Sequence, residues 1–387
     1  MDVNRINEYT LMKHNIIPGY QECCIENVAR NHLGLHSARI MTPYTTLCSR
    51  LKDYKPQMLT SQLYEDKKLI KMRCMRTTLH IVPFDIASVL HMATLNLRLA
   101  DCKLFFRKNA ISIEQVEDME DDLINFINLP KTSGEIEEAI LEKIEFVETD
   151  LKKECAKKIL KYFWEIGTLC YVNFAKNWEK EERRYAVTKQ FYSDIDLKQY
   201  DIRKAQELLV LEYIKKFGPA TINDLSWWSG LSLKVVREII ERNKCSITRF
   251  KVNGFETEFY ILAEEVQKLE EYKLYDSEWV TLLAYEDPSL KGYYESRYRY
   301  VDKRYYNLLF NQIGEVRASI LCNGKAIGIW EWDKKNKKIE LEYFFNPNES
   351  IKRKVKEIKE HYERMLFPDQ QITLFDSYFY AEFRKAL

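Results

Sequence analysis

The feature that most constrains the fold of this chain is a group of helices followed by a two-stranded hairpin, a pattern that recurs. Its clearest copy spans residues 203–263. Apolar residues at helical spacing predict a helix over Ala205–Phe217, and Thr221 and Ser232 are placed to cap two shorter helices. Gly230 lies between those two helices, so they form a pair joined by a short turn.

The same copy ends in a predicted hairpin. Two runs rich in β-branched and aromatic residues, Ile247–Val252 and Glu256–Ile261, flank Asn253-Gly254, and this dipeptide is a strong signal for a tight hairpin turn. A helix pair followed by such a ribbon is typical of a winged helix, whose second helix normally enters the major groove of DNA. Here that helix would present Lys234 and Arg237.

Two weaker copies precede it, over residues 1–85 and 130–192. The second begins with Thr132-Ser133-Gly134-Glu135, in which a capping hydroxyl is followed three residues later by an acid, as in a capping box. The expected strands are Leu69–Arg73 and Thr77–Val82 in the first copy, and Leu169–Phe174 and Arg184–Thr188 in the second. The order of elements therefore predicts three tandem winged-helix units.

The rest of the chain has a different pattern of predicted secondary structure. Residues 86–129 have the pattern of a helical connection, whereas strands and turns alternate over residues 279–345 and predict a small β-barrel. Residues 346–387 are expected to close the chain with two helices, Ser350–Met365 and Leu374–Ala386. The predicted class is α+β, with three tandem winged-helix units followed by a small C-terminal β-barrel.

Overall charge does not by itself indicate a nucleic-acid partner. The chain has 60 Lys and Arg against 59 Asp and Glu, a formal net charge of +1, so a DNA-binding face would depend on local clusters such as Lys68–Arg76 and Arg297–Arg304. The 9 cysteines lack paired or metal-binding spacing, which favours free thiols and a cytoplasmic location. No apolar run reaches the roughly 18 residues that a membrane span needs.

Several motifs, taken in order, resemble those of one family. They are Leu33-Gly34-Leu35-His36-Ser37-Ala38-Arg39, Thr42-Pro43-Tyr44 with Arg50, Met75-Arg76-Thr77-Thr78-Leu79-His80-Ile81-Val82, Phe217-Gly218-Pro219-Ala220-Thr221 with Trp228-Ser229-Gly230-Leu231, Asp287-Pro288 with Gly292-Tyr293 and Arg297, and Asn323-Gly324-Lys325 with Gly328-Ile329-Trp330. Together, over about residues 5–345, they resemble the winged-helix DNA glycosylases of crosslink repair, the AlkZ/YcaQ family.

This resemblance implies three winged helices and a β-barrel around a concave DNA channel, and excision of bulky N7-alkylated purines or interstrand crosslinks. Members of the family carry a Gln-Φ-Gln or Gln-Φ-Asp motif after Leu-Gly-Leu, and its polar side chains position the water that attacks the sugar carbon. In this chain the three motif positions hold His36, Ser37 and Ala38. The methyl group of Ala38 cannot hold a water, so this chain departs from the family at that position.

His36 is the candidate catalytic residue, because an imidazole whose pKa is near neutrality can hold or deprotonate a water. The alternative is that His36 only hydrogen-bonds the backbone or a phosphate. The DNA-contacting candidates of the first unit are Arg39, Arg50, Arg76, Thr78 and His80. Arginines bind phosphate through two hydrogen bonds, although each of these could instead pair with an acid, and Thr78 could be an ordinary strand residue. We expect the segment after Leu35 and the first ribbon to form one wall of a basic trough.

Three further candidates lie in the later parts of the chain. Asp287 and Arg297 could line the DNA cleft or pair with each other, and Asp287 is the spare carboxylate if the missing acid comes from outside the first unit. Trp228 could support the channel, although a place in the core is the simpler interpretation because its neighbour Trp227 cannot face the same way on a helix.

The sequence thus predicts a metal-independent monofunctional glycosylase that acts on double-stranded DNA. The substrate would be an alkylated purine or crosslink, or a modified base of phage DNA, which would indicate phage defence. The alternative is a non-catalytic winged-helix regulator or damage sensor, since both motif glutamines are missing. His32 and His36 lack the Glu and third ligand of a zinc site, and no phosphate-binding GxxxxGK[ST] loop is present. No metal, nucleotide cofactor or membrane partner is therefore expected.

Overall fold

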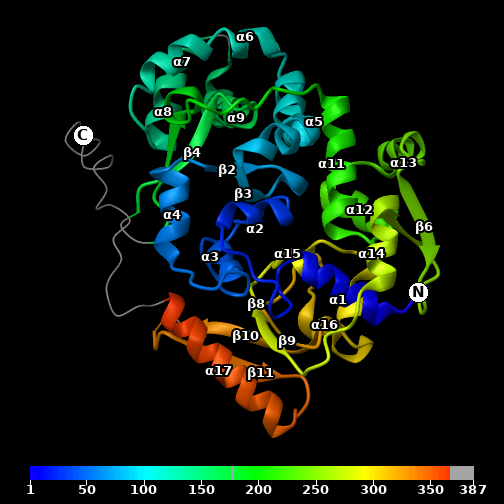
Figure 1. The fold of residues 1–387 in the computed structure, drawn as a ribbon. Helices are drawn as coiled ribbons and strands as arrows, with labels where there is room; N and C mark the ends of the chain where they lie inside the picture. Colours follow the sequence, from blue (N-terminus) through cyan, green and yellow to red (C-terminus); the bar gives the residue numbers. More distant parts are fainter. Residues whose placement is uncertain (146, 176–177, 334, 367–387) are drawn as a thin grey trace.

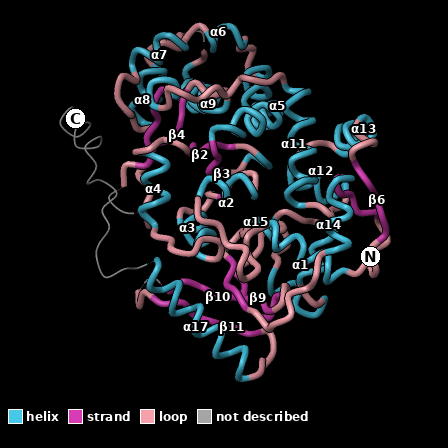
Figure 2. The backbone as a smooth tube through the Cα atoms, in the orientation of Figure 1, coloured by secondary structure: helices cyan, strands magenta, loops and turns pink. Residues whose placement is uncertain are grey.

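The computed structural model describes residues 1–145, 147–175, 178–333 and 335–366. In Figure 1 the N-terminal helices lie near the centre, α5–α9 lie above them, α11–α13 lie to one side, and the C-terminal strands with the last helix lie below. Figure 2 shows that helices dominate and that the strands are gathered in small separate groups. Within the described residues these groups are four antiparallel sheets, so each part of the chain builds its own short sheet.

The first part of the chain contains a three-stranded sheet of order β1-β3-β2. Its elements are α1 (Val3–Lys13), α2 (Ile25–Asn31), β1 (Leu35–His36), α3 (Met41–Cys48), α4 (Pro56–Tyr64), β2 (Leu69–Arg73) and β3 (Leu79–Pro83). The strand predicted at Leu69–Arg73 is confirmed, and β3 begins two residues later than predicted because Met75–Thr77 forms a 3-10 turn, η1. The sequence analysis did not predict β1, which carries His36 into the sheet.

A long helix links the first part to the second. The elements of this region are α5 (Phe84–Lys108), α6 (Ile113–Glu117), α7 (Glu120–Phe126), α8 (Ser133–Leu141), α9 (Lys152–Glu165), β4 (Leu169–Asn173), β5 (Arg183–Val187) and α10 (Thr188–Phe191). The predicted capping box is confirmed: the Thr132 hydroxyl accepts from the Glu135 amide at 3.3 Å, and the Glu135 carboxylate accepts from the Thr132 amide at 2.8 Å. Because α5 packs on both α9 and α11, it joins the second part to the third.

The third part contains the helix pair and ribbon that the sequence predicts most clearly. Its elements are α11 (Ile202–Phe217), α12 (Ile222–Ser229), α13 (Leu233–Arg242), β6 (Ile247–Lys251), β7 (Glu258–Leu262) and α14 (Val266–Glu271). The hydroxyls predicted to cap α12 and α13 each accept a hydrogen bond from a backbone amide of their helix. The hairpin and the turn at Asn253-Gly254 are confirmed, since the Phe255 amide donates to the Val252 carbonyl at 3.1 Å. The strands end earlier than predicted: Lys251 pairs with Glu258, so the turn lies within a loop of residues 252–257.

The C-terminal part is a four-stranded antiparallel sheet covered by a helix. Its elements are β8 (Val280–Leu283), α15 (Pro288–Lys291), α16 (Tyr306–Leu309), β9 (Ser319–Cys322), β10 (Lys325–Asp333), β11 (Lys338–Tyr343) and α17 (Glu349–Leu366). The strand order is β11-β10-β9-β8, and α17 packs on β8 and on α3 of the first part. The helix predicted at Ser350–Met365 is thus confirmed, whereas the one predicted at Leu374–Ala386 lies outside the described residues.

Buried apolar side chains form one large cluster that draws on every part of the chain, and a second cluster belongs to α5–α9 and the strands beside them. Shared burial of this kind fixes the parts relative to one another. All nine cysteines are free thiols. Among the described helices, none has both the length and the apolar content needed to cross a bilayer.

Candidate active site

A glycine brings His36 against the neighbouring strand. Gly34 has a φ of +102°, and a Cβ placed there would lie 3.2 Å from His80 Cβ, so a larger residue would push β1 away from β3. β1 therefore pairs closely with β3, with His36 opposite His80. The two imidazole rings meet edge to face with centroids 5.4 Å apart. The Leu-Gly-Leu segment thus fixes where the first motif residue points.

Both imidazoles are buried, and burial sets their charge. It is the main cause that lowers the pKa of His36 well below its usual range, followed by the nearby His80 and Lys291. Burial also lowers the pKa of His80 to about 4. Each ring is therefore neutral near pH 7. The His36 side chain is only 7% exposed, so the expectation that it lines an open trough is wrong in this conformation, because side chains from other parts of the chain cover it.

A carboxylate from the C-terminal part faces His36. Glu286 Oε2 lies 3.8 Å from His36 Nε2 and 2.6 Å from Lys291 Nζ, and its Oε1 accepts from the Val316 amide at 2.7 Å. Burial is the first cause of a raised pKa for Glu286, and the Lys291 ammonium opposes it. The ammonium also donates to the Gly314 carbonyl at 3.0 Å, which holds it beside the carboxylate. The site therefore pairs a neutral imidazole with a fixed carboxyl group.

Two arginines lie on aromatic rings around this cluster. The Arg76 guanidinium lies 3.9 Å from the centre of the Trp227 ring, and that of Arg39 lies 3.6 Å from the Tyr285 ring. Both arginines contribute to lowering the pKa of His36, which shows that they are near it. Arg76 has a φ of +50°, an uncommon backbone conformation for a residue with a side chain. The predicted residues Arg39, Arg76, His36 and His80 therefore do converge.

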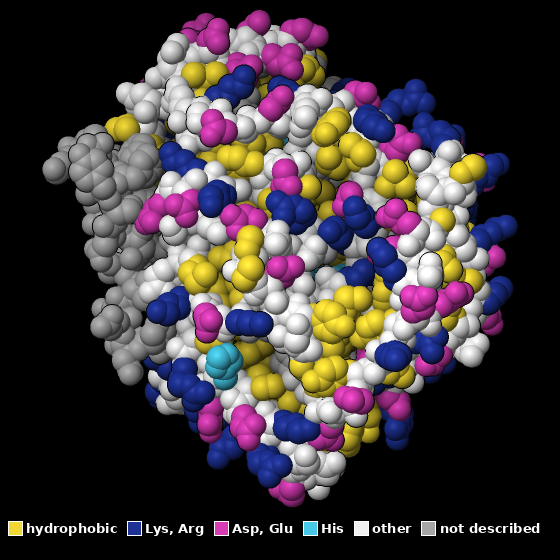
Figure 3. Space-filling view, in the orientation of Figure 1, with side chains coloured by type: hydrophobic (Ala, Val, Ile, Leu, Met, Phe, Trp, Pro, Cys, Tyr) yellow, Lys and Arg dark blue, Asp and Glu magenta, His cyan; other side chains and the backbone are white. Residues whose placement is uncertain are grey.

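A hollow of about 770 Å³ adjoins the cluster and is lined by Trp227, Tyr294, Arg297, Phe310 and Gly314 among others. The Arg297 guanidinium lies 4.8 to 5.0 Å from three of these rings and pairs with no acid in the described residues. Asp287 and Arg297 therefore do not pair, which settles one alternative left open by the sequence. Figure 3 shows Lys and Arg side chains together with apolar ones around a hollowed region near the middle of the face in view.

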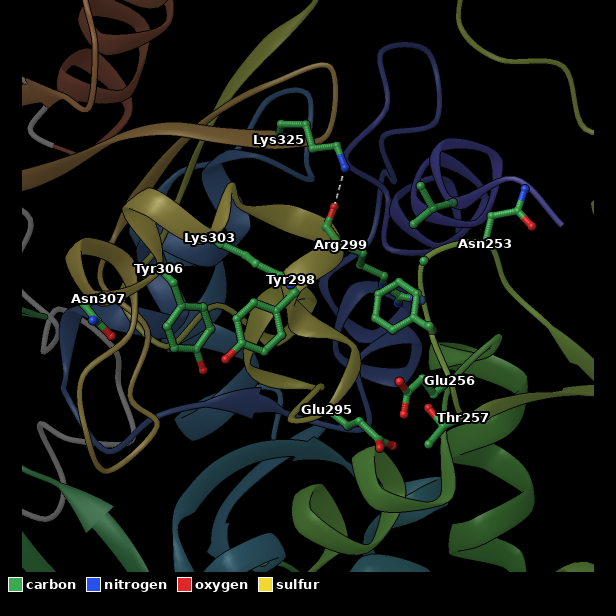
Figure 4. Close-up of a pocket in the computed structure, with 13 residues that line it drawn as sticks. Asn253, Glu256, Thr257, Glu295, Tyr298, Arg299, Lys303, Tyr306, Asn307 and Lys325 are labelled. Atoms are coloured by element: carbon green, nitrogen blue, oxygen red, sulfur yellow. Dashed lines mark hydrogen bonds between the residues drawn. The ribbon is translucent and has the colours of Figure 1, made fainter.

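A second hollow, of about 840 Å³, shares two lining residues, Tyr306 and Asn307, with the first. Figure 4 shows its walls: Glu256 and Thr257 come from the β6–β7 loop, and the rings of Tyr298 and Tyr306 stack with centroids 4.4 Å apart. The two hollows therefore meet at Tyr306 and Asn307, and the second reaches the loop of the ribbon of the third part.

Arg50 and Asp287 have a structural role that differs from the predicted one. Both side chains are 0% exposed, and Arg50 donates to the two carboxylate oxygens of Asp287 at 2.7 and 2.9 Å. Arg50 also donates to His32 Nε2 and to Ser289 Oγ. The prediction of a phosphate contact for Arg50 and of a cleft-lining role for Asp287 is therefore wrong in this structure, because the pair joins α3 to α15 inside the core.

The remaining predicted residues occupy varied surroundings. Trp228 is buried and packs on Tyr213 and Phe217, with ring centroids 5.0 and 5.3 Å apart, which matches the core alternative. The Thr78 hydroxyl donates to the Met75 carbonyl and so closes η1. The side chains of two more, Lys234 and Arg237, are exposed on α13. The described residues contain no group of three or more His, Cys, Asp or Glu side chains that could hold a metal ion.

Sequence reasoning missed Glu286 and Lys291. It chose the neighbouring acid, Asp287, because nothing local distinguishes two consecutive acids before a proline. Glu286 has a φ of +57°, and this backbone conformation turns the two carboxylates in different directions. Only the tertiary structure could reveal that Glu286 lies beside His36, because the two residues are 250 positions apart in the chain.

An α+β fold with a neutral imidazole, a carboxyl group and arginines gathered between helical units fits a protein that acts on nucleic acid. The family model described as DNA glycosylase AlkZ-like matches residues 30–366. This chain therefore belongs to the AlkZ-like DNA glycosylase family. Among solved structures, the DNA glycosylase AlkZ of Streptomyces sahachiroi is similar, with a TM-score of 0.78 and 17% sequence identity over 94% of this chain and 96% of that chain. A comparison with curated proteins gives no match.

Proposed function

We propose that this protein is a monofunctional DNA glycosylase that removes a bulky modified base from double-stranded DNA by water attack at C1′ of the sugar, without a metal. One observation carries the proposal: His36, at the position of the first motif glutamine, faces a carboxyl group among arginines. A neutral imidazole can hold the attacking water. The substrate would be an alkylated purine or crosslink, or a modified base of phage DNA.

The finer architecture belongs to the same proposal. Residues 1–85, 130–192 and 203–263 would be winged-helix units, 86–129 their connection, 279–345 a small β-barrel and 346–387 the closing segment. The supporting observation is that helices precede an antiparallel ribbon in each of the three units. The DNA-binding residues would be Arg39, Arg76, Thr78, His80, Lys234, Arg237 and Arg297.

The deciding experiment is excision. The protein is incubated with duplexes that carry N7-alkylated purines, crosslinks or phage-type modified bases, and alkali-labile abasic sites are counted. We expect His36→Ala to lose roughly 10²-fold or more of the excision rate while duplex binding is retained. His36→Gln restores the family residue and should keep part of the rate. His361→Ala, at an exposed histidine of α17, is the matched control, and absence of cleavage on every duplex would contradict the proposal.

A second candidate function is DNA binding without catalysis, as a regulator or damage sensor. It is favoured by the burial of His36 and by Ala38, which replaces the second motif residue. In that case His36→Ala would leave duplex affinity and every cellular phenotype unchanged. Under either function, duplex affinity should fall as salt rises, because phosphate contacts release counterions.

A further inference from the structure

We propose that Glu286 is a catalytic residue of this protein, the carboxylate that stabilises the positively charged sugar and accepts the proton of the attacking water, a role that Ala38 cannot perform. The inference rests on the proposed glycosylase function and adds the group that the motif lacks. It is carried by the juxtaposition of Glu286 with His36 across two parts of the chain.

The geometry suits a shared small ligand. At 3.8 Å, Glu286 Oε2 and His36 Nε2 are too far apart for a direct hydrogen bond but close enough to hold one water between them. The other ring nitrogen, His36 Nδ1, is buried and has no hydrogen-bond partner in the described part of the chain. A buried polar atom without a protein partner needs an explanation, and we assign this nitrogen to a water or a substrate group.

The carboxylate is held in place before any substrate binds. Lys291 Nζ contacts Oε2 and the Val316 amide donates to Oε1, so neither oxygen turns freely. The backbone of Glu286 has a φ of +57°, which is an uncommon conformation for a residue with a side chain.

The chemical step balances with water as the only co-reactant. The bond from C1′ to the base nitrogen breaks, and its electron pair leaves with the base. The carboxylate of Glu286 stabilises the cationic sugar that remains. Water then forms the C1′–O bond, and the proton from its broken O–H bond passes to Glu286 and on to solvent.

Substrate reaches this pair only after the covering side chains move. Arg76 lies on Trp227 and Arg39 on Tyr285, so a phosphate that binds either guanidinium would draw it off its ring. The hollow beside Trp227 and Gly314 then gives room for the displaced base.

The first test is binding and needs no knowledge of the natural substrate. Two duplexes differ in a single abasic analogue, a protonated pyrrolidine or a neutral tetrahydrofuran. We expect the wild-type protein to prefer the cationic analogue roughly tenfold or more, Glu286→Gln to bind both equally, and Glu315→Gln, a nearby acid that hydrogen-bonds Asn311, to keep the preference. Equal binding by the wild type, or a preference that survives in Glu286→Gln, would overturn the proposal.

The second test is excision on whichever duplex the wild type cleaves. Glu286→Gln should lose roughly 10²-fold or more. Lys291→Met removes the charge that lowers the pKa of Glu286, so the acid limb of the pH–rate profile should move to higher pH by about 1 unit or more. Full activity in Glu286→Gln would overturn the role of Glu286 and leave the glycosylase function standing. A preference for the cationic analogue without excision of any base would support the role of Glu286 in binding the cation and contradict the glycosylase function. Circular dichroism and affinity for an unmodified duplex confirm that each variant is folded.

Discussion

Glu286 and Asp287 are consecutive acidic residues, yet the surroundings of their two carboxyl groups differ. Asp287 is fully buried, accepts two hydrogen bonds from Arg50 and caps α15 through the Ser289 amide. Glu286 is also buried, but it lies at an unusual backbone angle and faces an imidazole whose second nitrogen is unpartnered. The Asp287 carboxylate is thus held by direct hydrogen bonds to Arg50, whereas Glu286 and His36 face each other without one.

This difference separates a structural ion pair, Arg50 with Asp287, from the carboxyl and imidazole groups that we propose to be catalytic. A complete hydrogen-bond network stabilises the interior, and removing one partner leaves a buried charge. An incomplete network with backbone strain is costly and persists where function requires it. Substitutions in and around the two regions can break or sharpen that distinction.

The largest effect is expected at the Arg50–Asp287 pair. Asp287→Asn leaves the Arg50 guanidinium buried at 0% exposure without a counter-charge, so the free energy of unfolding should fall by about 3–5 kcal/mol. Urea denaturation followed by circular dichroism measures this. The control is Lys143→Met, which breaks an exposed pair with Asp122 and should cost about 1 kcal/mol or less. Equal losses in the two variants would remove the contrast between the regions.

Acid should weaken the fold through His80. Its pKa in the folded protein is about 4, below the value of roughly 6.5 expected in the unfolded chain. The unfolded state therefore binds the proton first, and stability that is present above pH 6.5 is lost as the pH falls towards 4. The loss from His80 alone should be roughly 3 kcal/mol. His36, which has a pKa lowered in the same direction, adds to it.

Urea denaturation at a series of pH values measures this loss. His80→Gln cannot titrate, so its free energy of unfolding should fall less between pH 6.5 and 4 than that of the wild type. His361→Gln, at an exposed histidine, should follow the wild-type curve more closely. Parallel curves for wild type and His80→Gln would show that the buried imidazole is not neutral.

Local signals explain which parts of the fold the sequence predicts. The capping box at Thr132 and the cap at Ser232 each depend on residues three apart, and both form as expected. The tight Asn253-Gly254 turn forms, because the Phe255 amide donates to the Val252 carbonyl at 3.1 Å, but strand pairing already ends at Lys251 and Glu258, so the connection is longer than the dipeptide suggests. The sequence favoured Asp287 over Glu286 as the candidate carboxylate, because neighbouring residue types do not predict a positive φ or the direction of the side chain that results from it. His36 could be proposed from the sequence because its motif is contiguous, whereas Glu286, which faces it, comes from another part of the chain.

A smaller effect, of opposite sign, is expected at Glu286. Its pKa is raised in the folded state, so stability from protonation is present below the unfolded value of roughly 4.3 and is lost as the pH rises through the folded value. As the pH rises, the free energy of unfolding of Glu286→Gln should therefore increase relative to that of the wild type. The expected difference is about 1 kcal/mol, which is usual when a functional residue is replaced. Urea denaturation at pH 4 and pH 8 measures the difference, and a loss like that of Asp287→Asn would make Glu286 structural.

The smallest effect is expected on α13, which belongs to neither region. Lys234 and Arg237 are exposed there, and as phosphate ligands they would strengthen binding to any duplex without touching the reaction. Replacing both with Gln should lower the slope of log affinity against log salt by about 1 for each phosphate interaction removed, equally for modified and unmodified DNA. The excision rate at saturating protein should stay constant. Lys356→Gln on α17, a lysine whose side chain is 74% exposed, is the control. A drop in affinity confined to modified DNA would instead mean that α13 binds the altered base, and the site would then extend beyond the cluster around His36.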